Sequence, residues 1–166
     1  MSRQPTQLER RTGKQRGFSL IELLIVVAVI LIIAAIALPN FIRSRMRANE
    51  AAAVQNLRNI TTANVVYLTT YQIGFADSLP KLGGNTPTPD ANASMLIDSV
   101  LGGGIKTGYS FTYVATATAN GQVVAYSVNA DPTTVGATGD KYFYVDQTSI
   151  IRQNTTGPAS SADPAL

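Results

Sequence analysis

The longest apolar run in the chain covers residues 18–38, where only Ser19 and Glu22 are polar. At about 1.5 Å per residue, a helix of this length reaches about 31 Å, which is the thickness of one bilayer core. The run therefore predicts a membrane-spanning helix. A secretory signal peptide is the alternative, because Ala35-Ile36-Ala37 resembles a small-residue cleavage site. The run is long for a signal sequence, and a carboxylate near its start is unexpected there.

The helical pattern continues beyond Pro39, where apolar positions recur three, four and seven residues apart. These positions form one helix face: Met46, Ala53, Leu57, Ile60, Tyr67 or Leu68, and Tyr71. We expect one long helix over about residues 18–73, ending at Gly74. Its second half is amphipathic and needs a covering layer. Pro39 removes the backbone hydrogen bond to the Ala35 carbonyl and predicts a kink.

Residues 74–89 have the Gly and Pro content of a loop. Asp90 is a candidate N-cap for a short helix through Leu101, which the glycines at 102–104 would end. From Tyr109 the apolar period becomes two, which predicts a strand, and Asn120-Gly121 is a strong hairpin signal.

The return strand is expected over residues 123–128, and residues 142–145 and 149–152 form a second candidate hairpin. The pattern as a whole predicts an α+β fold, in which a long N-terminal helix packs on a small antiparallel sheet. Residues 153–166 are rich in Ser, Thr, Ala and Pro, and we expect a loose tail.

The net charge of +3 comes from the N-terminus. Residues 1–17 carry five cations and one acid, so the remaining chain has a net side-chain charge of about −1. The charge therefore gives no argument for nucleic-acid binding. The basic leader is typical of a signal that keeps the N-terminus in the cytoplasm. Arg43, Arg45 and Arg47 follow the span and oppose that rule, and we interpret them as a solvated helix face.

The chain contains no Cys and no His, which excludes disulfides, thiolate or imidazole metal sites and His-based catalytic triads. It has no phosphate-binding loop and no nucleophile elbow, so we expect neither an enzyme nor a cofactor. Asp131, Asp140 and Asp146 are weak candidates for a calcium site. Their neighbours Pro132 and Gly139 favour a second interpretation, in which they are turn residues.

The segment from Gly17 to Phe41, which begins Gly-Phe-Ser-Leu-Ile-Glu, strongly resembles the N-terminus of type IV pilins and type II secretion pseudopilins. The resemblance implies that a prepilin peptidase cuts between Gly17 and Phe18 and methylates the new amine of Phe18. It also implies that Glu22 aligns subunits during assembly. The family usually has a glycine in mid-helix, where this chain has Leu31.

We therefore expect a cleaved leader at 1–17, a membrane and filament-core helix at 18–38, a head at 39–152 and the tail. The expected function is that of a structural subunit of a type IV pilus-like filament. Its precursor would lie in the inner membrane, and its product would be a cell-surface filament or a periplasmic pseudopilus. The expected partners are further copies of the chain, prepilin peptidase, the assembly machinery and membrane lipid. A type II secretion pseudopilin and a membrane-anchored binding domain that never polymerises are the alternatives.

Overall fold

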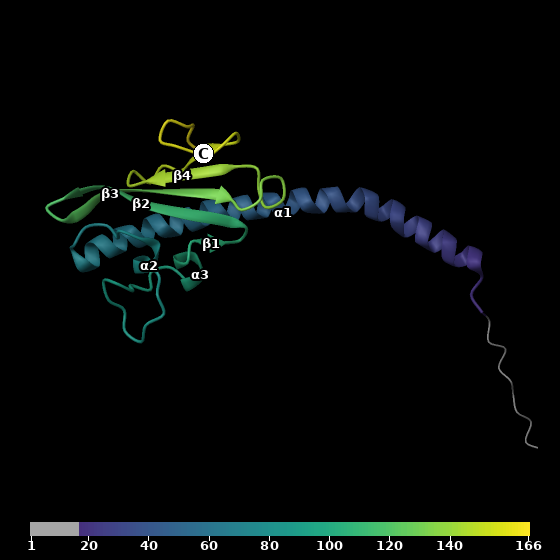
Figure 1. Cartoon of the computed structure of the whole chain (residues 1–166), viewed down its shortest axis with the longest axis horizontal. Coiled ribbons are helices and arrows are strands. Elements are labelled where there is room, and N and C mark those ends of the chain that lie inside the picture. The colour runs from purple at the N-terminus through teal and green to yellow at the C-terminus, as the bar shows by residue number, and fades with distance from the viewer. Residues whose placement is uncertain (1–16) are drawn as a thin grey trace, which may run out of the picture. The chain divides into compact units, whose positions relative to one another are not determined.

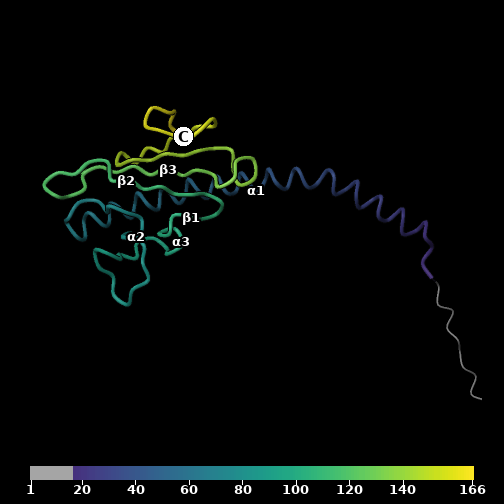
Figure 2. Tube along the Cα trace, in the orientation of Figure 1, coloured from purple at the N-terminus to yellow at the C-terminus, as the bar shows by residue number. Residues whose placement is uncertain are grey.

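The computed structural model describes residues 17–166, so residues 1–16 of the expected leader lie outside the described part. Its longest element is helix α1, Leu20–Tyr71, which contains Pro39 (Figures 1 and 2). The chain divides into two compact units, one ending at Pro39 and the other comprising Asn40–Leu166. The helix ends two residues earlier than the sequence predicts, because Gln72 already has a left-handed backbone with φ of 55°.

The second unit contains a five-stranded antiparallel sheet with the strand order β1-β2-β3-β4-β5 (Figure 1). The strands are β1 Ile105–Lys106, β2 Tyr109–Ala119, β3 Gln122–Pro132, β4 Tyr142–Asp146 and β5 Arg152–Asn154. The hairpin predicted at Asn120-Gly121 is confirmed, with φ of 52° and 77° at these two residues. Two positive φ values in succession are what a two-residue hairpin turn of type I′ requires.

The sheet covers the predicted apolar face of α1 and forms the core of the second unit with it. Leu57, Ile60 and Tyr67 are fully or almost fully buried, and Tyr71 packs at the edge of the same cluster. The opposing sheet residues are Tyr109, Phe111, Tyr126, Val128, Phe143 and Val145. The predicted α+β fold is therefore confirmed.

The short helix predicted from Asp90 is wrong. The structure has helix α3, Ser99–Gly102, and its N-cap is Asp98, whose side chain accepts a hydrogen bond from the Leu101 N–H at 3.0 Å. The Asp90 carboxylate instead accepts from the N–H groups of Asn92 and Ala93 and closes a local turn. A further short helix, α2 Leu79–Leu82, lies where the sequence predicts only a loop.

The expectation of a loose tail is also wrong. The Gln153 N–H donates to the Pro164 carbonyl at 3.1 Å, and the Leu166 N–H donates to the Ile151 carbonyl at 2.9 Å. The guanidinium of Arg152 donates to the Asp163 carbonyl at 2.7 Å. The tail is polar in composition, yet these hydrogen bonds fold it back along β5.

Candidate assembly site at the N-terminus

The expected cleavage point lies in an exposed segment that precedes α1. Gly17 and Phe18 are not helical, and the Phe18 side chain is 86% exposed. A β-carbon placed on Gly17 would meet nothing within 4 Å. Folding of the chain therefore does not require glycine at this position, which leaves close approach of another protein to the backbone as a reason for it.

Glu22 already has a partner within its own chain. Its Oε2 accepts a hydrogen bond from the Ser19 backbone N–H at 3.0 Å, and the Ser19 carbonyl accepts the Leu23 N–H at 3.2 Å. Ser19 thus stands just before the first helical residue, and Glu22 reaches back to it as the acid of a capping box does. The Ser-x-x-Glu spacing of residues 19–22 is the signal in the sequence that specifies this cap.

The helix that follows exposes an apolar surface all round. An 18-residue window of α1 has a mean hydropathy of 3.2, and none of it is buried. Large residues at the centre of this stretch, such as Ile30 and Leu31, are about 60% exposed, at 58% and 63%. A surface of this kind requires lipid or other apolar helices around it. Leu31, where the family usually has glycine, is part of this continuous helix.

Pro39 lies inside α1, where it cannot donate a backbone hydrogen bond. The helix continues through it to Tyr71. The kink expected at Pro39 stays a prediction, as does the expected role of Glu22 in subunit alignment.

The three candidate calcium ligands do not form one group. Asp140 Oδ1 accepts from the Gly136 N–H at 3.1 Å, and Asp146 caps the turn at Thr148. Asp131 is half-buried in β3, and its Oδ1 has no hydrogen-bond partner among the described residues. Within residues 17–166 no three acidic side chains are gathered closely enough to hold a metal ion. The turn interpretation therefore fits Asp140 and Asp146.

Comparison with known proteins matches the N-terminal part of the chain. Residues 12–38 match the model of the prokaryotic N-terminal methylation motif. The type IV major pilin protein PilA of Myxococcus xanthus is 49% identical over 57 residues, which cover 34% of this chain and 26% of that protein.

Two further relatives match over similar lengths. The type IV wide pilus major component PilA4 of Thermus thermophilus is 42% identical over 52 residues, covering 31% of this chain and 40% of the relative. The type II secretion system core protein G of Escherichia coli is 33% identical over 58 residues, covering 35% of this chain and 40% of the relative.

The matched segments thus span between about a quarter and two fifths of these relatives. No solved structure matches the chain. The motif and the relatives agree with the exposed Gly17–Phe18 junction, the acid at position 22 and the bare apolar helix. The N-terminal part of the chain is therefore similar to that of two type IV major pilins and of a type II secretion core protein.

Proposed function

We propose that the chain is a structural subunit of a type IV pilus-like filament. It is made as an inner-membrane precursor with a cytoplasmic N-terminus, cleaved after Gly17, methylated at Phe18 and polymerised through its N-terminal helix. The observation that carries the proposal is the apolar half of α1, which begins with a carboxylate and has no covering layer among the described residues. In a filament, neighbouring helices would replace the lipid around it.

Glu22 gives this assembly its alignment. Cleavage would turn the Phe18 nitrogen into a cationic amine, one helical turn from Glu22. Ser19 occupies only one carboxylate oxygen of Glu22 through a neutral hydrogen bond. A neighbour's amine in a dry helix bundle would offer a charge-assisted bond, which is shorter and stronger. Subunits are then favoured in the register that brings this amine and this carboxylate together.

A pseudopilin of a type II secretion system is the second candidate, and the similarity to core protein G favours it. The two candidates share the whole N-terminal mechanism and differ in the product. A pilin would form long surface fibres, whereas a pseudopilin would form short filaments in the periplasm.

Intact-mass analysis combined with fibre shearing tests the proposal. The mature protein should begin at Phe18, carry one added methyl group and be the main protein of the sheared fibres. Gly17→Val should leave the precursor uncut and the fibres absent, because the added side chain blocks approach to the peptide bond. Gly157→Ala is the matched control, since its β-carbon would also meet nothing within 4 Å.

A mature protein that retains residues 1–17 would contradict the proposal and favour a membrane-anchored domain that does not polymerise. A new N-terminus near Leu38 would instead identify a secretory signal. Correct processing without surface fibres, together with short periplasmic filaments, would favour the pseudopilin.

A further inference from the structure

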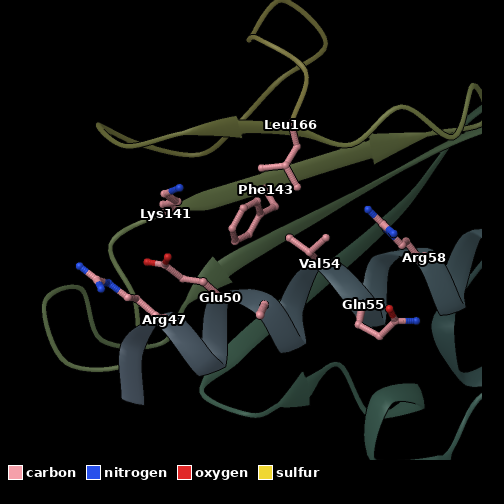
Figure 3. A pocket seen from close by; sticks show the side chains of 9 residues that line it. Arg47, Glu50, Val54, Gln55, Arg58, Lys141, Phe143 and Leu166 are labelled. Carbon is pink, nitrogen blue, oxygen red and sulfur yellow. The ribbon is translucent and has the colours of Figure 1, made fainter. Parts of the chain in front are cut away.

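A cationic groove runs along one side of α1 in the second unit. One part of it, a cavity of about 410 Å³, is lined by Arg43, Met46, Arg47, Glu50, Asp140, Lys141 and Thr155. The adjoining part, of about 420 Å³, shares Arg47, Glu50 and Lys141 with it. Figure 3 shows Arg47 and Glu50 on the helix and Lys141 on the segment that leads into β4, where its ammonium donates to Gln153 Oε1 at 3.2 Å. The groove therefore combines residues almost a hundred positions apart in the chain.

The acids in this groove are directed towards backbone amides. Glu50 Oε1 accepts from the Asp140 N–H at 3.1 Å, and Asp140 Oδ1 accepts from the Gly136 N–H at 3.1 Å. The only ion pairs found within residues 17–166 are Lys81–Asp77 and Lys106–Asp98, which lie elsewhere. Arg43, Arg47 and Lys141 thus have no carboxylate partner within the described structure.

This concentration of cations contrasts with the slightly acidic composition of residues 18–166, which contain eight cations and nine acids. Four of the eight cations, Arg43, Arg47, Arg58 and Lys141, line the two parts of the groove, and Arg45 stands between Arg43 and Arg47 in the sequence. The groove is therefore richer in cations than the head as a whole, although Glu50 and Asp140 also line it.

The distance from the apolar span indicates which anion lies within reach. Arg43 and Arg47 follow Leu38 by only five and nine residues, so the chain cannot carry them far from the end of the apolar span. The polar layer on each side of a bilayer core is about 5–8 Å thick.

We propose that Arg43, Arg47 and Lys141 bind the phosphate of an anionic phospholipid headgroup in the membrane that holds the unassembled subunit. This inference rests on the membrane anchoring in the proposed function. By the positive-inside rule, the side of the span away from the cytoplasm is usually poor in Lys and Arg. Binding of a lipid headgroup would explain why this chain has arginines there. Glu50 and Asp140 line the same cavity, and they would repel the closely spaced phosphates of an extended polyanion such as duplex DNA more than they repel a single headgroup phosphate.

Native mass spectrometry of the full chain in detergent micelles tests the inference. The probes are phosphatidylglycerol and phosphatidylcholine with identical acyl chains. The unsubstituted chain should retain phosphatidylglycerol at about tenfold lower lipid concentration than phosphatidylcholine. Arg43→Gln/Arg47→Gln/Lys141→Gln should abolish this preference. Lys81→Gln/Lys106→Gln/Arg152→Gln removes the same charge outside the groove and should keep the preference, and circular dichroism should show both variants folded.

Equal retention of the two lipids, or the same loss in both triple variants, would overturn the inference. Displacement of phosphatidylglycerol by an equal concentration of inorganic phosphate would also overturn it, because the groove would then bind free phosphate. Binding of duplex DNA through these three residues, with no preference between the two lipids, would overturn the inference as well. Fibre formation is not measured in this experiment, so its failure leaves the proposed function standing.

Discussion

At the residue scale, Glu22 carries the most specific chemistry of the chain. Its carboxylate accepts the Ser19 N–H and thereby caps the start of α1. The same group is the expected partner of a neighbour's amine. Capping needs only an acceptor oxygen, whereas pairing with a cationic amine also uses the negative charge. Substitutions at this one position can therefore separate the two roles.

We expect Glu22→Gln and Glu22→Ala to insert and to be cleaved normally but to lose most fibres, because neither offers a negative charge. Glu22→Asp, one methylene shorter, should give an intermediate number of fibres. The measurement is a count of sheared fibres together with blots of precursor and mature protein from the same cells. Normal fibres from Glu22→Gln would show that capping alone is what assembly needs.

Asp131 provides a pH-dependent prediction. Burial raises the pKa of its carboxyl above its ordinary value, and its Oδ1 has no hydrogen-bond partner within the described residues. The native state therefore holds this proton at a pH where the unfolded chain releases it. The contribution of Asp131 to the free energy of unfolding should rise as the pH falls through the raised pKa.

Asp131→Asn should consequently raise the melting temperature of the full chain in detergent at neutral pH, since it removes a half-buried charge. The gain should shrink at about pH 4, near the ordinary pKa of aspartate. The check is a comparison of thermal melts of the two proteins at both pH values. An equal difference at both would show that the ionisation of Asp131 does not affect stability.

Gly139 should tolerate no side chain, because a β-carbon there would overlap the hydroxyl group of Tyr109. Tyr109 is fully buried and donates to the Lys141 carbonyl at 2.8 Å, so its ring has little freedom to move. Gly139→Ala should cost about 1–3 kcal/mol of unfolding free energy. Gly157→Ala, at an open position, is the control, and equal melting temperatures for both variants would contradict the packing described here.

At the scale of elements, one helix serves two environments. Up to about Leu38, α1 is apolar on every side and suits lipid or a helix bundle. Beyond Pro39 it becomes amphipathic, and a single face enters the core with the sheet. The second half is stabilised mainly by tertiary packing, as is usual for amphipathic helices in proteins.

Leu57 tests this packing, because it is fully buried between α1 and the sheet. Leu57→Ala should lower the free energy of unfolding by about 2–5 kcal/mol through lost contacts and a residual cavity. Gln55→Ala, on the exposed side of the same helix, should change it by at most about 0.5 kcal/mol. Denaturant unfolding of both variants provides the measurement. A Leu57→Ala protein as stable as the Gln55→Ala control would contradict the packing of the sheet on this face of α1.

At the scale of the whole molecule, the division at Pro39 separates a unit with an exposed apolar surface from a unit with its own core. A fragment that starts near Arg45 keeps the buried face of α1, all five strands and the tail contacts. It should therefore be soluble and folded without detergent. Circular dichroism should show both helix and strand, and a fragment without strand signal would show that the head depends on the first unit.

The sequence by itself determined the elements whose signals are local. The 21-residue apolar run, the one-sided pattern around Leu57 and Ile60 and the Asn120-Gly121 turn each specify their structure through spacing or backbone preference. The N-terminal motif is likewise linear, so Gly17, Phe18 and Glu22 were identified without coordinates. The apolar run, the one-sided pattern and the hairpin turn were predicted correctly, because each depends on residues that are close together in the chain, whereas the roles of Gly17, Phe18 and Glu22 stay predictions.

Only the tertiary structure decided the position of the short helix, the fold of the tail and the composition of the groove. In these regions the contacting residues are distant in sequence, or two local signals compete. Asp90 and Asp98 are both residues of the type that caps helices. Asp90 closes the turn at Asn92 and Ala93, and Asp98 caps the short helix. The polar tail has no periodic pattern of apolar residues that would predict a strand or a helix. It is nevertheless held beside β5, because the Pro164 carbonyl accepts from the Gln153 N–H and the Leu166 N–H donates to the Ile151 carbonyl. Lys141 joins the arginine side of α1 only because the sheet folds back on the helix, which brings together charges that no spacing rule connects.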